Sequence, residues 1–427
     1  MRKRMMTTAG IVTMLALIFS LSGCVRVSVT ENVPENVSAS VTPVAEPGEV
    51  QEPRNITPLR DAVTSSEGLG EDAIFGCCLN SKSINDKELF DLAMTNFNAV
   101  TLENELKPES MFGRHNNRPA DGSIHEEELN GTLISVPKID HSDADTMLDK
   151  ILEWNEVHPD KSVKVRGHVL VWHSQTPEWF FRVGYDPDKD YVSKEEMDRR
   201  LEWYIGSILE YYTGTGSRYA DLFYAWDVVN EAVSDRTGGY RTEQSGWWNV
   251  YGSEEYIINA YRFANKYAPA GLDLYYNDYN ECDPKKQKGI IALIQDVKSA
   301  GGTRIDGFGM QGHYSVNAPT SETIESAVRQ YADVAGKVML TELDVKHSMF
   351  YNGTEEGLEK EYNRQAQYYQ KIYDVLRKLH SEGVNLRGMS FWGVSDRYTW
   401  LSGQHPLLYD KDLEPKPAYE VFMNDKE

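Results

Sequence analysis

The sequence is poor in basic residues and in cysteine, and each shortage excludes a class of protein. Its 427 residues include 44 Lys and Arg against 66 Asp and Glu, which gives a net charge of −22. A field of this sign repels phosphate backbones, so we expect no nucleic-acid partner. Beyond Cys24, the cysteines are Cys77, Cys78 and Cys282, and their odd number predicts no disulfide framework.

Histidines in a metal-binding arrangement are also missing. Neither His-x-His nor His-Glu-x-x-His occurs. His168 and His173 are five positions apart on an extended run, so they point to opposite faces of it. The sequence therefore argues against a metal hydrolase, and we expect neither a metal nor another cofactor.

The long apolar run at the N-terminus is typical of a targeting signal. Basic residues 2–4 precede residues 9–21, a run shorter than the roughly 20 residues of a membrane span. It ends in Leu-Ser-Gly-Cys24, which resembles the lipobox of bacterial lipoproteins and implies a lipidated Cys24 after a signal peptide, residues 1–24. The alternative is a simple signal peptide with an incidental cysteine. We expect an extracellular protein, either anchored to the bacterial cell membrane through Cys24 alone or secreted.

Residues 25–59 have the composition of a disordered tether. They contain five prolines and five glutamates but no aromatic residue, so the segment is too polar to pack and is stiffened by proline. The remaining residues, 60–427, contain no repeat and leave no room for a second sizeable domain. We expect them to form a single catalytic domain.

Short apolar runs alternate with segments of helical period after residue 60. Helices are predicted at Ser253–Ala268 from apolar spacing, after the capping box Ser193-Lys-Glu-Glu196, and at Gly357–His380. Alternating strands and helices imply a parallel sheet, and eight such units imply a closed (β/α)8 TIM barrel of the α/β class. The eight predicted strands are Ile74–Leu79, Ala99–Leu102, Val165–Val171, Leu222–Val229, Leu272–Tyr276, Ile305–Met310, Val338–Thr341 and Leu386–Phe391.

Residues 112–140 do not fit this alternation. They lack a helical period and are rich in Gly, Asn and charged residues. The segment is too long for an ordinary connection between a strand and a helix. We therefore expect an inserted loop that is either functional or mobile.

Polar and aromatic side chains gather where the predicted strands end, and in a barrel of this kind the catalytic groups come from those ends. In chain order they are Glu103, Asn104, Lys107, His168, Trp172, Gln175, Asn230, Glu231, Asn277, Tyr279, Gln311, His313, Glu342, Asp344, Trp392 and Trp400.

Two of these residues, Glu231 and Glu342, end strands that face one another across an eight-stranded barrel. Two carboxyl groups that flank one bond are the minimal equipment for glycoside hydrolysis. An ionised Glu342 nearby is expected to raise the pKa of Glu231, which suits a general acid. The tryptophans suit the flat apolar faces of sugars.

Eight ordered motifs resemble those of the glycoside hydrolase family 10 endo-β-1,4-xylanases. The likeness extends from about residue 60 to the end of the chain. The motifs are TLENELKPES, RGHVLVWHSQTPEW, AWDVVNEAVSD, LYYNDYN, GMQGHY, LTELDV, SFWGVSDRYTW and PLLYDKDLEPKPAY.

The resemblance implies a retaining, double-displacement endo-hydrolysis of β-1,4-xylosidic bonds in xylan. Glu342 would be the nucleophile and Glu231 the general acid and then base, with their carboxyl groups about 5–5.5 Å apart. Asn230 would bind the 2-hydroxyl of the sugar under attack. His313, bonded to Glu342 and steadied by Asp344, would keep the nucleophile ionised.

The resemblance also implies how substrate is bound. Trp392 and Trp400 would close over the position where glucose carries its hydroxymethyl group, which favours xylose. Xylan and xylo-oligosaccharides would be the partners, and we expect a monomer. The implied substrate-binding residues are Glu103, Asn104, Lys107, His168, Trp172, Gln175, Asn277, Tyr279, Gln311, Trp392 and Trp400.

Two alternatives remain open on the sequence. One is a glycosidase for another β-1,4-glycan, which a comparison of xylan and cellulose oligomers as substrates would decide. The other is a surface lipoprotein that binds xylo-oligosaccharides without cleaving them. The presence of both carboxyl groups and of Asn230 argues against the second alternative.

Overall fold

Eight apolar segments form the parallel strands of a closed barrel, which confirms the predicted (β/α)8 fold. The computed structural model describes residues 57–348 and 353–423. Each barrel strand pairs with the next along the chain, and β11 pairs with both β1 and β10, which closes the ring. The barrel strands are β1 (Ile74–Leu79), β2 (Ala99–Leu102), β5 (Lys164–Trp172), β6 (Phe223–Asn230), β7 (Asp273–Asp278), β8 (Gly307–Met310), β10 (Lys337–Lys346) and β11 (Leu386–Phe391).

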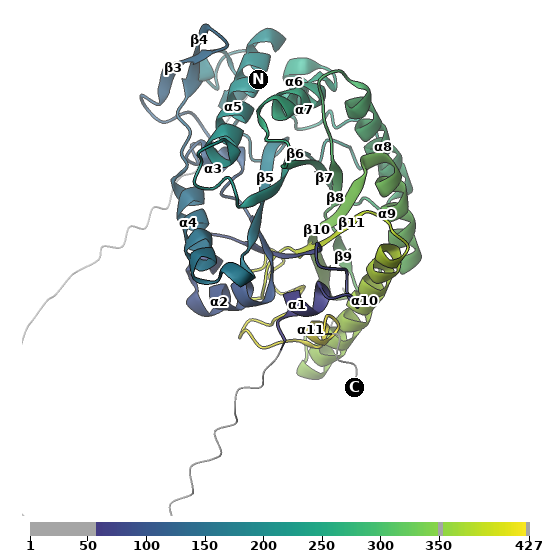
Figure 1. Cartoon of the computed structure of the whole chain (residues 1–427). Coiled ribbons are helices and arrows are strands. Elements are labelled where there is room, and N and C mark those ends of the chain that lie inside the picture. The colour runs from purple at the N-terminus through teal and green to yellow at the C-terminus, as the bar shows by residue number, and fades with distance from the viewer. Residues whose placement is uncertain (1–56, 349–352, 424–427) are drawn as a thin grey trace, which may run out of the picture. The chain divides into compact units, whose positions relative to one another are not determined.

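Helices surround the barrel strands, as Figure 1 shows. The predicted capping box opens one of them, because the Ser193 side chain accepts a hydrogen bond from the Glu196 N–H at 3.3 Å. The α-helices are α1 (Leu59–Val63), α2 (Lys87–Asn96), α3 (Pro108–Met111), α4 (Ser142–Val157), α5 (Lys194–Thr213), α6 (Gly246–Tyr251), α7 (Glu255–Tyr267), α8 (Pro284–Ser299), α9 (Ser321–Ala335), α10 (Glu355–Ser381) and α11 (Pro417–Glu420). Short 3-10 helices are η1 (Ser83–Asn85), η2 (Pro159–Lys161), η3 (Glu178–Phe181) and η4 (Val183–Tyr185).

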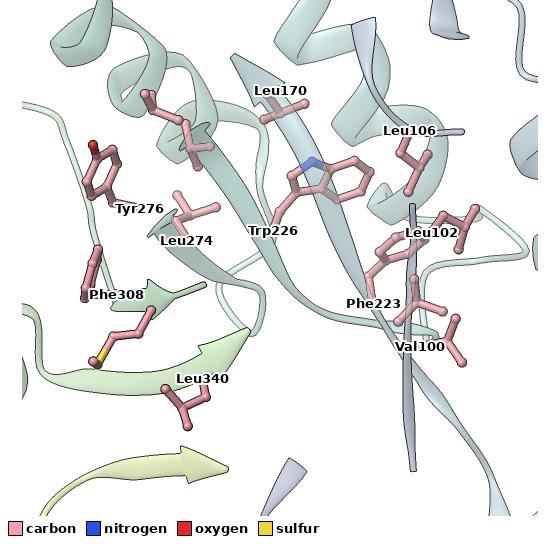
Figure 2. Packing of buried hydrophobic residues seen from close by; sticks show 14 of the residues in the cluster. Val100, Leu102, Leu106, Leu170, Phe223, Trp226, Leu274, Tyr276, Phe308 and Leu340 are labelled. Atoms are coloured by element: carbon pink, nitrogen blue, oxygen red, sulfur yellow. The ribbon is translucent and has the colours of Figure 1, made fainter. Parts of the chain in front are cut away.

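The main core lies between the strands and the helices. Phe223 and Trp226 of β6 stack with ring centroids 4.9 Å apart, and Leu170 and Leu274 from the neighbouring strands belong to the same cluster (Figure 2). Gly167 of β5 has to be glycine, because a Cβ there would lie 2.1 Å from the Trp226 ring. A smaller cluster, formed by alternate residues of the strands, fills the start of the barrel interior; it consists of Ile74, Ala99, Ala225, Tyr275 and Met339.

β10 is longer than the predicted strand Val338–Thr341. It continues to Lys346 because its far half pairs with β9 (His313–Ser315), with Asp344 opposite His313. Glu342 and Asp344 interrupt the apolar run in the sequence, yet both are buried. The polar end of this strand is therefore part of the barrel and not of a loop.

Residues 112–140, predicted from the sequence to be an inserted loop, contain a β-hairpin. β3 (Ile124–Leu129) pairs antiparallel with β4 (Thr132–Pro137). The two-residue turn Asn130–Gly131 has positive φ at both positions, the conformation that Asn-Gly favours. The hairpin lies beside α5 (Figure 1), where Trp203 Nε1 donates to Glu127 at 2.8 Å.

The predicted signal peptide with Cys24, and the predicted tether up to residue 56, lie outside the described residues. Leu59, assigned to the end of the tether from the sequence, begins α1 and is fully buried. Within the two described ranges, no helix combines the length and the apolar character that crossing a membrane requires.

Candidate active site

Glu231 follows the last residue of β6 in a left-handed backbone conformation, with φ of 56°. This conformation costs a non-glycine residue about 1–2 kcal/mol, and such strain is concentrated at functional sites. Its N–H donates to the Asn277 carbonyl at 2.9 Å, and its carbonyl accepts from Arg241 Nε at 2.8 Å. The fold therefore holds Glu231 in a conformation that it would not adopt by itself.

The carboxyl group of Glu231 lies among an indole, an amide and an imidazole. Trp172 Nε1 donates to Oε2 and Gln311 Nε2 donates to Oε1, both at 2.9 Å, and His173 Nδ1 lies 3.9 Å from Oε2. Burial raises the pKa of Glu231, and the charge of buried Asp278 raises it further. Glu342 also raises the pKa of Glu231, as expected from the sequence, but it contributes less than burial or Asp278.

Glu342 has the opposite electrostatic surroundings. Asn277 Nδ2 donates to its Oε1 at 2.7 Å, and His313 Nε2 lies 3.2 Å from its Oε2. Burial by itself would raise the pKa of Glu342, but the hydrogen bond from His313 and the nearby cationic groups more than offset it, and the pKa is lowered. Glu342 is therefore ionised at neutral pH.

His313 is the cation beside Glu342. Burial favours its neutral form, but Asp344, at 2.9 Å from Nδ1, and Glu342 raise its pKa to about 10. Trp400 Nε1 also donates to Asp344 at 2.9 Å. The predicted support of the nucleophile by His313 and Asp344 thus has the required geometry.

Three amides link the two glutamates across the barrel mouth. Asn230 Oδ1 accepts from Asn277 Nδ2 at 3.0 Å and from Gln311 Nε2 at 3.3 Å. The same two donor groups bind Glu342 and Glu231 respectively. Asn230 Nδ2 makes no hydrogen bond to the described part of the chain, so it is available to a ligand.

A second polar group lies beside Trp172. Lys107 Nζ donates to Asn104 and to Gln175, both at 3.1 Å, and lies 4.9 Å from the centroid of the Trp172 ring. Glu103 Oε2 accepts from Asn80 Nδ2 at 2.7 Å. Lys107, Asn104 and Gln175 thus lie beside Trp172, which itself donates to the carboxyl group of Glu231.

The two predicted tryptophans after β11 lie over the histidines of the site. Trp392 packs edge-on against His168, with centroids 5.4 Å apart, and Trp400 against His313 at 5.1 Å. Trp400 is 53% exposed, whereas Trp392 is 8% exposed. Trp400 thus offers an open aromatic face beside His313.

The predicted residue Tyr279 lies at the edge of this group. Its hydroxyl donates to Asp235 and accepts from Arg241 at 3.2 Å, and Lys286 Nζ lies 3.5 Å from its ring centroid. It contacts these charged residues and neither of the two glutamates.

Two fully buried aspartates of the site were not predicted from the sequence. Asp227 of β6 accepts from Arg166 and pairs with His168 Nδ1 at 2.8 Å. Asp278 ends β7 and pairs with Lys286 Nζ at 2.9 Å. An acid inside an apolar strand is a usable signal, because a buried charge needs a partner.

Within the described ranges, no group of three or more His, Cys, Asp or Glu side chains is arranged to hold a metal ion.

Comparison with known proteins gives a consistent set of relatives. Residues 65–425 match the profile of Glycosyl hydrolase family 10. The chain is 35% identical over 336 residues to the bifunctional endo-1,4-beta-xylanase XylA of Ruminococcus flavefaciens, covering 78% of this chain and 31% of that protein. It is 31% identical over 333 residues to endo-1,4-beta-xylanase B of Paenibacillus barcinonensis, covering 76% of this chain and 87% of that protein.

Solved structures agree with the sequence relatives. The N-terminal xylanase 10B modules of Clostridium thermocellum, complexed with xylohexaose, superpose with a TM-score of 0.71 at 29% identity, covering 87% of this chain and 68% of that one. A psychrophilic family 10 endo-beta-1,4-xylanase gives a TM-score of 0.67 at 31% identity, covering 86% and 99%. The chain spans only about a third of the length of the first curated relatives that it matches, 31% in two cases.

Proposed function

The chain belongs to glycosyl hydrolase family 10, and we propose that it hydrolyses internal β-1,4-xylosidic bonds of xylan with retention of configuration. The observation that carries the proposal is the pair of glutamates at the barrel mouth, linked through Asn277, Asn230 and Gln311, with opposite shifts in pKa, raised for Glu231 and lowered for Glu342. A protonated acid and an ionised carboxylate on one site are the requirements of a retaining glycosidase.

In the first step, the ionised Glu342 attacks the anomeric carbon while Glu231 gives its proton to the departing glycosidic oxygen. The C–O bond to the leaving sugar breaks as a glycosyl–carboxylate ester forms at Glu342. In the second step, the deprotonated Glu231 takes a proton from water, and the resulting hydroxide equivalent displaces Glu342 from the sugar. Asn230 Nδ2 is available to bind the sugar 2-hydroxyl, a contact that tightens as positive charge develops on the ring.

Support for the binding roles comes from the groups around this pair. Trp400 supplies an exposed aromatic face, and the cluster of Lys107, Asn104 and Gln175 supplies donors and acceptors for hydroxyls. Two similar structures were solved in complex with xylohexaose and with xylotriose, which supports xylose chains as the substrate of this chain.

The deciding experiment follows the products of the purified protein on xylan, on cellulose oligomers and on mannan. We expect reducing ends to appear from xylan much faster than from the other two, with oligomers of several lengths appearing early. Proton NMR of the first products should show the β-anomer, since two displacements restore the configuration. Binding of xylo-oligosaccharides without cleavage, or an initial α-anomer, would contradict the proposal.

We also propose that the enzyme acts as a monomer held at the outer face of the bacterial membrane through a lipid on Cys24. The lipobox-like sequence and the proline-rich segment 25–59 support this location. Expression of wild type and Cys24→Ala, followed by fractionation, tests it. Wild type should sediment with membranes and Cys24→Ala should be released, whereas equal release of both contradicts lipidation.

A further inference from the structure

The left-handed main chain of Glu231 is braced by a hydroxyl that the proposed mechanism does not use. The N–H of Ala232, the residue that follows Glu231, donates to the Tyr276 hydroxyl at 2.9 Å. Tyr276 belongs to β7 and is fully buried. Together with Asn277 and Arg241, it fixes the peptide groups on both sides of Glu231.

The Tyr276 hydroxyl is in turn held by a buried ion cluster. It donates to Oδ2 of Asp278, whose Oδ1 accepts from the Tyr279 N–H and pairs with Lys286 Nζ, both at 2.9 Å. Lys286 also pairs with Asp235 at 2.8 Å, and its side chain is only 1% exposed. The side chain of Asp278 is fully buried.

Such a cluster is poorly explained by stability alone. Removing two charges from water costs about as much as their attraction returns, and well-packed apolar residues are often as stable. The cluster lies close to Glu231. Asp278 ends β7, the strand next to β6, and Asn230, which precedes Glu231, is in register with Asn277, which precedes Asp278. The titratable and charged groups that face Glu231 are Lys107 after β2, His173 after β5, Arg241 before α6, Asp278 on β7 and Glu342 on β10.

We propose that Tyr276 and Asp278, with Lys286 as counter-ion, are positioning residues that aim the carboxyl group of Glu231 at the glycosidic oxygen. The inference rests on the proposed function, because it requires Glu231 to be the proton donor. Lys286 pairs with Asp278, Asp278 accepts a hydrogen bond from the Tyr276 hydroxyl, and that hydroxyl accepts one from the N–H that follows Glu231. The negative charge of Asp278 additionally favours the protonated form of Glu231.

Tyr276→Phe tests the brace, because it removes only the bridging hydroxyl. We expect kcat/KM on xylo-oligosaccharides to fall about 10-fold or more, since general-acid catalysis is sensitive to geometry. A dinitrophenyl xylobioside, whose leaving group departs without a proton, should lose less than about 2-fold in kcat/KM. KM for the xylo-oligosaccharide should change little.

Tyr219→Phe is the matched control. Tyr219 is also buried and donates to a carboxylate, Asp149 Oδ1 at 2.8 Å, but it precedes β6 at the opposite end of the barrel. We expect this variant to treat both substrates alike. If Tyr276→Phe lost the same factor in kcat/KM on both substrates, Tyr276 would only stabilise the fold, and the inference would be overturned.

Asp278→Asn and Lys286 variants test the cluster. Asp278→Asn should move the alkaline limb of the pH profile of kcat/KM down by about 1 unit, because a like charge near Glu231 is lost. Lys286→Arg should retain more kcat/KM on xylo-oligosaccharides than Lys286→Met, because arginine keeps the positive charge that pairs with Asp278. An unmoved limb, or no rescue by arginine, would also overturn the inference. If wild type itself fails to cleave xylan, the proposed function fails instead, so the two failures are distinguishable.

Discussion

The carboxyl group of Glu342 faces a cation, whereas that of Glu231 faces an indole, an amide and a second buried acid. His313, whose pKa is raised to about 10, donates to Glu342 and lowers its pKa. Trp172 and Gln311 donate neutral hydrogen bonds to Glu231, but burial and Asp278 outweigh them and raise its pKa. Both side chains are largely buried, so burial alone does not distinguish them.

The difference between the surroundings of Glu342 and Glu231 shows that neighbouring residues set the direction of each pKa shift. The hydrogen bond from His313 is the largest of the contributions that lower the pKa of Glu342, whereas Glu231 has no such cationic donor among the described residues. With that hydrogen bond, the pKa of Glu342 is lowered while that of Glu231 is raised. Substitutions of Glu342, of Glu231 and of His313 should therefore impair activity in different ways.

Glu342→Gln should have the largest effect. The amide has no anionic oxygen to attack the anomeric carbon, so kcat should fall by about 10⁴-fold or more. An activated aryl xyloside should fare no better than xylan, because the first step still needs the nucleophile. Release of sugar and of phenol measures both activities. Appreciable turnover of the aryl xyloside would contradict the role assigned to Glu342.

Glu231→Gln should impair xylan cleavage by about 10²- to 10⁴-fold. Unlike the first variant, it should still form the glycosyl-enzyme from a dinitrophenyl glycoside, seen as a burst of phenol. Its residual kcat/KM on xylo-oligosaccharides should lack the alkaline limb of wild type, because the group that must remain protonated to assist that leaving group is gone. A variant without a burst would show that the two glutamates are not separable in this way.

His313→Gln should move the acidic limb of kcat/KM to higher pH by about 1 unit. The direction follows because loss of the cation raises the pKa of Glu342, which must be ionised to react. His158→Gln is the control, since His158 follows the last residue of α4, where its ring bonds to the Trp154 carbonyl at 3.0 Å and stacks on the Trp154 ring, and it contacts neither glutamate. If the two variants had the same pH profile of kcat/KM, His313 would not be the cause of the lowered pKa of Glu342.

The same histidine links activity to stability. The pKa of His313 is raised in the folded state, so the stabilisation that it gives is fully present below the unfolded value of about 6.5. It is lost as pH rises through the folded value of about 10. Denaturant midpoints of wild type and His313→Gln should therefore differ most near pH 6 and converge toward pH 10. A constant difference between them would contradict the assigned charge.

The barrel was predictable because its strands coincide with short apolar runs in the sequence. β1, β2 and β11 begin and end at the predicted residues, and the polar residues that follow the strands do converge. What periodicity did not reveal are the buried charges Asp227 and Asp278, since their partners Arg166 and Lys286 lie on other elements. The chief cause of the raised Glu231 pKa was missed for the same reason.

The hairpin of residues 112–140 was missed for a different reason. Its strand Ile124–Leu129 carries three consecutive glutamates and shows little apolar alternation, so the strand pattern was weak. The signal that remained was the turn Asn130–Gly131, which is typical of a two-residue hairpin. Local turn chemistry would have identified the element, and only its packing on α5 was beyond the sequence.

Removal of this hairpin should have the smallest effect on the contrast between the glutamates. The Lys138 N–H donates to the Ser123 carbonyl at 2.9 Å, so two glycines can replace residues 124–137 and leave the ends in place. Trp203 and Tyr185 lose their bonds to the hairpin, which should lower stability. Neither glutamate loses a partner, so kcat/KM on linear xylo-oligosaccharides should stay within about 2-fold. A change confined to the product pattern from branched xylan would assign the hairpin to side-group recognition, whereas an unchanged pattern would exclude that role.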